Sequence, residues 1–146
     1  MKLKQNETLR EFDRMNRMMD EHIHEIAASV GLSDSAYDIL KSILFLDDGC
    51  TQTDICRYSH LNKQTVNSSV KKLEKSGYIS FERGVGRERR ILLTEPGKQV
   101  IKEKVIPVVK AENEIFNKMS EGERSIIHDI SQRYMTAIGE ELAPII

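Results

Sequence analysis

The chain has few of the residues that stabilise small secreted or fibrous proteins. Its 146 residues include no tryptophan, two cysteines, three prolines and eight glycines. Two cysteines are too few for a disulfide framework, so we expect Cys50 and Cys56 to be free thiols in a reducing compartment and, more simply, small buried residues. So little proline and glycine excludes a collagen-like or low-complexity chain. The composition is that of one folded, helix-rich domain.

Long hydrophobic runs are also absent. No apolar run approaches the roughly 20 residues that a membrane-spanning helix needs. The first segment, MKLKQNETLREF, lacks the apolar stretch of a secretory signal. We therefore expect a cytoplasmic protein with no membrane partner.

The net charge of −1 hides an uneven distribution along the chain. Between Arg57 and Arg90 there are nine basic residues against three acidic ones, a local balance of +6, so the remainder carries −7. A chain that gathers its cations in the central third has one surface suited to polyanionic phosphate. This pattern favours a nucleic-acid partner, although lysines also cluster on ordinary solvated surfaces.

Apolar spacing predicts a long first helix from about residue 7 to residue 30. Its apolar residues recur every three, four or seven positions, at Leu9, Phe12, Met19, Ile23, Ile26 and Val30. This stripe has the spacing for packing against a helix of a second chain, or within the same chain. Gly31 ends the helix, and Ser33 is the expected N-cap of the next, whose inward residues are Tyr37, Leu40, Ile43, Leu44 and Leu46.

The centre of the chain predicts two helices joined by a short turn. Thr51 and Asp54 have the spacing of a capping box that opens a short helix. Asn62 caps the next helix, residues 63–76, in which Val66, Val70 and Leu73 form a buried stripe. Gly77 then ends the helix.

A basic hairpin is expected after this helix. Residues 78–83 alternate in polarity as a half-buried strand does, with Ile79 and Phe81 on one side. Residues 84–87 supply the turn, and residues 89–94 the return strand. The tip has too little apolar surface to be buried.

Two further helices are predicted after the hairpin. Thr94 caps a helix that runs to about Met119, and Pro107 in its interior should kink it. Ser120 and Glu123 form a capping box for the last helix. The apolar side of the first of these helices comprises Val100, Ile101, Val105, Val108, Val109, Ile115 and Phe116, and the expected buried face of the last helix comprises Ile126, Ile127, Ile130, Tyr134, Ala137 and Ile138.

Two helices joined by a short turn and followed by a hairpin form a winged helix-turn-helix pattern. The outward side chains of residues 63–76 suit base edges and phosphates: Gln64 and Asn67 match adenine, Ser68 matches several bases, and the lysines match guanine or phosphate. Guanidinium groups on a thin ribbon follow the backbone or enter the minor groove, and Arg87 lies at the tip. The candidate DNA-binding residues are Lys63, Gln64, Thr65, Asn67, Ser68, Lys71, Lys72, Arg87 and Arg89.

On these residues the sequence resembles the MarR family of bacterial transcription regulators over nearly its whole length. The matching stretches are QTDIC at 52–56, KQTVNSSVKKLEKSGYI at 63–79 and RILLTEPG at 90–97. The resemblance implies a mainly α fold with a small β wing: a single domain over 1–146, with the winged helix-turn-helix at about 33–95 and dimerisation helices at about 5–30 and 95–143. It also implies a homodimer on a near-palindromic operator in double-stranded DNA, usually a repressor released by a small-molecule effector or a redox signal.

Carried over by position, residues 63–76 match the family's recognition helix and Arg87 matches the arginine at the wing tip. One departure concerns the wing. The family often has an aspartate two residues before that arginine, where it helps to orient the wing, but this chain has Val85 there.

Other classes of function have weaker support in the sequence. We expect no enzyme and no cofactor, because glycine-rich phosphate loops, nucleophile elbows and catalytic carboxylate pairs are missing. His22 and His24 point in different directions on a helix, so one helix cannot chelate a metal with both. A redox switch at Cys50 or Cys56 and a winged helix that binds protein instead of DNA remain alternatives.

Overall fold

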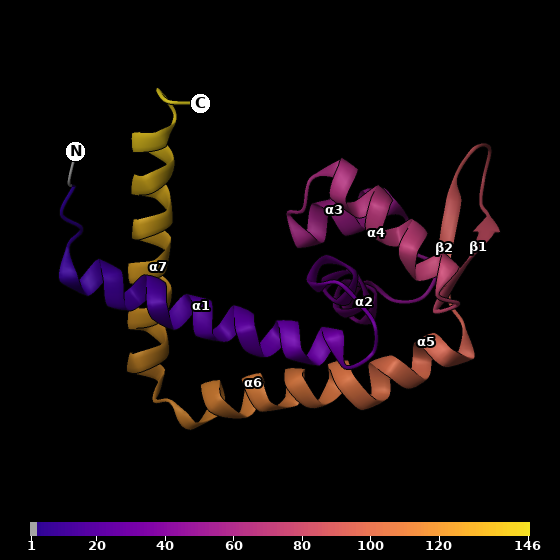
Figure 1. Cartoon of the computed structure of the whole chain (residues 1–146), viewed down its shortest axis with the longest axis horizontal. Coiled ribbons are helices and arrows are strands. Elements are labelled where there is room, and N and C mark those ends of the chain that lie inside the picture. The colour runs from indigo at the N-terminus through magenta and orange to yellow at the C-terminus, as the bar shows by residue number, and fades with distance from the viewer. Residues whose placement is uncertain (1–2) are drawn as a thin grey trace. The chain divides into compact units, whose positions relative to one another are not determined.

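The computed structural model describes residues 3–146, which form helices and one two-stranded sheet (Figure 1). The expected fold class, mainly α with a small β wing, is confirmed. The chain divides into two compact units, of which the first ends at Ile106 and the second comprises Pro107–Ile146. Within residues 3–146, no helix is both long and apolar enough to cross a membrane.

The first helix, α1, spans Glu7–Ala28 and begins where the Asn6 side chain accepts a hydrogen bond from the Leu9 amide. Its length agrees with the prediction. Its predicted apolar stripe is only partly covered: Leu9, Ile23, Ile26 and Val30 are half-buried, whereas Phe12 and Met19 are exposed.

Three helices form the core of the first unit: α2 (Asp34–Leu46), α3 (Gln52–Ser59) and α4 (Lys63–Lys75). The three predicted N-caps, at Ser33, Thr51 and Asn62, are all confirmed. In α2 the predicted inward residues Tyr37, Leu40 and Ile43 are buried, while Leu44 and Leu46 are only half-buried. Ile39 and Ala36, which the apolar spacing did not single out, are also buried.

The hairpin consists of β1 (Ile79–Arg83) and β2 (Arg89–Leu93), paired antiparallel with Phe81 opposite Ile91. Its outer edge is bonded to the loop that joins α2 to α3. The Gly49 amide donates to the Ile91 carbonyl and the Ile91 amide to the Cys50 carbonyl, both at 2.8 Å. The Leu93 amide donates to the Asp48 carboxylate at 2.7 Å. These bonds attach the base of the wing to the helix-turn-helix.

The helix expected from Thr94 to Met119 is interrupted. Thr94 caps α5 (Glu95–Val100), but a π-helical turn, η1 (Ile101–Val105), separates α5 from α6 (Ile106–Lys118). The π turn ends two residues before Pro107, whose missing amide hydrogen removes a bond from the α-helical ladder there. The Tyr37 hydroxyl donates to the Lys104 carbonyl at 2.9 Å, which bonds this turn to α2. The expected disruption at Pro107 thus takes the form of a π turn.

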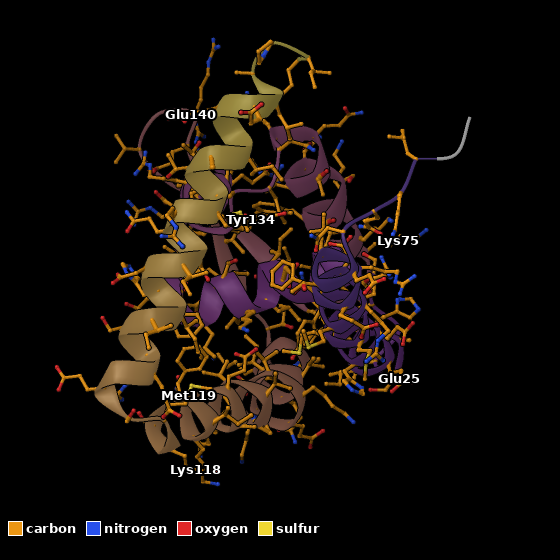
Figure 2. All side chains as sticks on the ribbon, turned by 90° about the vertical axis from the view of Figure 1, so that its left-hand side faces the viewer. Glu25, Lys75, Lys118, Met119, Tyr134 and Glu140 are labelled. Atoms are coloured by element: carbon orange, nitrogen blue, oxygen red, sulfur yellow. The ribbon has the colours of Figure 1, made fainter. Side chains whose placement is uncertain are left out.

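The second unit contains α6 and the last helix, α7 (Glu121–Leu142), joined by a turn at Met119. The capping box is confirmed, with Ser120 and Glu123 each accepting a hydrogen bond from the backbone amide of the other. The apolar face predicted for α7 is exposed within a single chain. No residue in the described α7 is buried, and Ile126 and Ile130 are 58% and 53% exposed. Figure 2 shows the side chains along α7, where Tyr134 and Glu140 are labelled.

Candidate nucleic-acid interface

Helix α4 is fixed at both ends and along its inner face. The Asn62 side chain accepts from the Thr65 amide at 2.8 Å, which satisfies one donor of the first turn. Val66, Val70 and Leu73 are fully buried, as their spacing predicts. At the far end Gly77 adopts φ +76°, a conformation that glycine reaches without the strain of a Cβ. The opposite face of α4 is therefore held in a fixed orientation.

A hydrogen bond between two serine hydroxyls also holds α4 against α2. Ser69 is almost completely buried, and its Oγ lies 2.8 Å from the Oγ of half-buried Ser35. A buried hydroxyl costs free energy unless it is hydrogen-bonded, and this pair satisfies both groups. Sequence patterning missed Ser69 because serine is ordinarily a surface residue.

The outward face of α4 presents most of the predicted contact residues to solvent. Lys63, Gln64, Asn67, Ser68, Lys71 and Lys72 are exposed. Thr65 is half-buried, and its carbonyl accepts the Ser68 hydroxyl at 3.0 Å, so Ser68 retains acceptor capacity for a base. Within the described chain, the lysines of α4 make no ion pair at 4 Å or less, so their charges face solvent.

The wing extends from the C-terminal end of α4 (Figure 1). Arg83, Arg87 and Arg89 line a hollow of about 470 Å³ on it, together with Phe81, Glu82, Gly86 and Glu88. Arg87 is exposed near the tip and, among residues 3–146, has no ion-pair partner. Its charge is available to a phosphate or a minor groove.

Arg89 is placed differently from Arg87. Its guanidinium carbon lies 3.8 Å from the centroid of the Phe81 ring, and its Nη2 lies 3.8 Å from the Glu74 carboxylate. Arg90 also has an acidic neighbour, with its Nη2 at 3.5 Å from Glu88. The arginines of the wing therefore have different environments: Arg89 and Arg90 each lie near a carboxylate, whereas Arg87 has no ion pair among residues 3–146.

Hydrogen bonds between Thr51 and Asp54 stabilise the first turn of α3, the helix that precedes α4. Asp54 accepts hydrogen bonds from the backbone amide and the hydroxyl of Thr51, at 2.9 and 2.7 Å. These bonds, with smaller contributions from Arg57 and Arg90, lower the pKa of the Asp54 carboxyl. The capping box predicted from Thr51 and Asp54 is confirmed and fixes the start of α3 beside the loop that bonds to the wing.

The two cysteines differ in environment. Cys50 is 7% exposed, and burial, with a smaller contribution from the Asp54 charge, raises the pKa of its thiol to about 11. A thiol with so high a pKa is a poor nucleophile at neutral pH. Cys56 is half-buried, and neither cysteine forms a disulfide. The environment of Cys50 is that of a structural residue.

The histidines of α1 do not gather metal ligands. His24 Nδ1 lies 2.8 Å from the Asp34 carboxylate, and both side chains are exposed. Among residues 3–146, no group of three or more histidine, cysteine, aspartate or glutamate side chains has metal-binding geometry.

Taken together, the capped helix pair, the exposed amide and lysine face of α4 and the arginine-tipped hairpin define a winged helix-turn-helix protein. A family model described as "MarR family" matches residues 30–90, which contain α2, α3, α4, β1 and the first two residues of β2. This part of the chain is similar to the MarR family of winged-helix transcription regulators.

Solved structures share this fold over most of the chain. The structure of Staphylococcus aureus MepR in complex with DNA has a TM-score of 0.72 at 17% identity and covers 92% of this chain and 99% of its own. A MarR protein from Peptoclostridium difficile has a TM-score of 0.71 at 15% identity, with coverage of 100% and 96%. The PcaV regulator from Streptomyces coelicolor, solved with its natural ligand, has a TM-score of 0.64 at 15% identity, with coverage of 93% and 99%. A comparison with the curated proteins found no match.

Proposed function

We propose that the protein is a cytoplasmic homodimeric repressor that binds a near-palindromic operator and is released by a small-molecule effector. The observation that carries the DNA-reading part of this proposal is the exposed face of α4. It presents two amides and four lysines over a fully buried apolar stripe, and no ion pair within the described chain occupies those lysines. Such a face fits the major groove, where amides read adenine and lysines reach guanine or phosphate.

The assignment of residues follows from this face and from the wing. Gln64, Asn67 and Ser68 contact base edges. The lysines and the wing tip bind the sugar-phosphate backbone and position α4, while half-buried Thr65 supports the first turn. The backbone-binding residues are Lys63, Lys71, Lys72 and Arg87.

The homodimer is supported by the exposed apolar residues outside the winged helix. On α7, Ile126 and Ile130 are more than half exposed on one face, and α1 separately exposes Met15 and Met19. A monomer would leave these side chains in water, whereas monomeric proteins rarely expose large contiguous apolar patches. A second copy related by two-fold symmetry would cover them and place two reading heads about one DNA turn apart.

A small-molecule effector is inferred from a protein of similar fold. PcaV from Streptomyces coelicolor was solved in complex with its natural ligand. By analogy we infer that this chain also has a small molecule that lowers its affinity for DNA. A ligand releases the operator only if it binds the DNA-free state more tightly than the DNA-bound state.

Selection of bound fragments from the source genome tests the proposal. We expect a recurrent near-palindromic sequence that binds two subunits, with affinity that falls steeply as salt rises, by about 0.9 in log–log slope per phosphate contacted. Transcription in vitro from a promoter that overlaps this site should decrease when the protein is added. An increase would contradict the repressor role, and no binding to any duplex at ~50 mM salt would favour a protein-binding winged helix.

A further inference from the structure

One acidic residue interrupts the basic face of the recognition helix. Helix α4 carries Lys63, Lys71, Lys72 and Lys75, and Glu74 is its acidic residue. A carboxylate on a surface that approaches DNA repels phosphate and lowers affinity. DNA binding alone therefore does not explain why an acidic residue occupies position 74.

The structure places Glu74 beside a wing arginine. The Arg89 Nη2 lies 3.8 Å from the Glu74 Oε1, and the flat guanidinium lies 3.8 Å from the centroid of the Phe81 ring. Glu74 belongs to the last turn of α4, Phe81 to β1, and Arg89 is the first residue of β2. One arginine of β2 thus contacts both the recognition helix, through Glu74, and β1, through Phe81.

The two contacts of Arg89 constrain it in complementary ways. The guanidinium is attracted to the face of the Phe81 ring, and a planar group stacked on a ring has a restricted orientation. Glu74 then neutralises part of the charge that Arg89 would otherwise offer to phosphate. Arg87, two residues earlier, has neither contact and remains unpaired within the described chain.

We propose that Arg89 is a positioning residue that fixes the wing against the recognition helix through Glu74 and Phe81, instead of binding phosphate itself. This inference rests on the proposed reading of DNA by α4 and Arg87. It assigns Arg89 a positioning role in place of the DNA contact that the sequence predicted. The Glu74–Arg89–Phe81 contact sets the spacing between the helix in the major groove and the arginine at the wing tip.

The direction in which Glu74→Gln changes the affinity for DNA distinguishes this role from a direct contact between Arg89 and phosphate. Replacing an acid on a DNA-binding face ordinarily tightens binding, because a repulsion is removed. If Glu74 holds Arg89, however, Glu74→Gln loosens the wing and weakens binding to the selected operator. An exposed ion pair of this kind supports an effect of about two- to five-fold.

The experiment measures operator affinity against salt for Glu74→Gln, Arg89→Gln, the double variant, and Arg87→Gln as the matched control. We expect Glu74→Gln and Arg89→Gln each to weaken binding about two- to five-fold with an unchanged salt slope. The double variant should bind no more weakly than Arg89→Gln alone, since both changes remove the same contact. Arg87→Gln should lower the slope by about 0.9.

The proposal is overturned if Glu74→Gln tightens binding or leaves it unchanged, or if Arg89→Gln lowers the salt slope as Arg87→Gln does. A measurement without DNA provides a second test. Amide hydrogen exchange of wing residues 84–88 should be faster in Glu74→Gln and Arg89→Gln than in the parent, and equal exchange would also overturn the proposal. If the parent binds no duplex, the proposed function fails, while hydrogen exchange still decides whether Glu74 and Arg89 hold the wing.

Discussion

Gly97 lies against the backbone of Tyr78 so closely that a Cβ atom on Gly97 would be 1.9 Å from the Tyr78 carbonyl oxygen. Thr94 strengthens the same junction, because its hydroxyl donates to the Gly77 carbonyl and accepts from the Gly97 amide. The start of α5 is thereby packed directly on the segment that joins α4 to the wing. Only a residue without a side chain permits this approach.

Gly97→Ala should therefore lower the free energy of unfolding by about 1–3 kcal/mol, because backbone atoms must shift to admit the methyl group. Urea unfolding at fixed protein concentration measures the change. Gly122→Ala is the matched control, since a Cβ there meets only the Ser120 Oγ at 3.9 Å in the first turn of α7. Equal free energies of unfolding for the Gly97→Ala variant and the parent would show that the backbone moves to admit the methyl group without loss of stability.

Local rules predicted much of this fold from the sequence. Ser33, Thr51, Asn62, Thr94 and Ser120 were all recognised as N-caps, because a cap is decided by residues within one turn. The buried stripe of α4 was predicted for a similar reason, since its spacing places three apolar residues on one face.

Features that depend on distant residues were not predicted. The spacing of apolar residues on α7 indicates a face that needs a partner, but it does not say whether the same chain supplies that partner, and in one chain Ile130 is exposed. The π turn before Pro107 and the pairing of Arg89 with Glu74 depend on helix geometry and side-chain conformation. The candidate site was thus predicted as a set of residues, but the different environments of Arg87 and Arg89 needed the structure.

The thiol of Cys50 should react slowly. With a pKa raised to about 11, only about one Cys50 in a thousand is a thiolate at pH 8. In the folded protein, a Cys56→Ser variant, which retains Cys50, should react with a disulfide reagent far more slowly than it does in urea. Because the thiolate is the reactive form, the rate should continue to rise with pH above pH 9. A rate that levels off near neutral pH would show an activated thiol and support the redox alternative.

Bases and phosphates should be read by different residues of the interface. Arg87→Ala should weaken binding to all duplexes, since backbone contacts carry no sequence information. Gln64→Ala and Asn67→Ala should mainly reduce discrimination between the operator and a scrambled duplex, by roughly 1–3 kcal/mol for a lost bidentate contact with a base. Anisotropy titrations against both duplexes measure the two effects. If the Gln64 and Asn67 variants keep full selectivity, the exposed face of α4 does not read the bases.

The apolar face of α7 should hold the dimer. Ile130 is 53% exposed in a single chain and lies at the centre of the apolar positions of this helix. A charge in an apolar contact between two copies would be desolvated without a partner, so Ile130→Glu should shift the protein toward monomers. Sedimentation velocity at several concentrations measures this shift, and affinity for the full operator should fall more than affinity for a half-site. Gln132→Glu adds the same charge to α7, with the side chain about 200° around the helix from Ile130, and should leave the dimer intact. A monomeric parent, or an Ile130→Glu variant that sediments as a dimer at low micromolar concentration, would exclude this face as the interface.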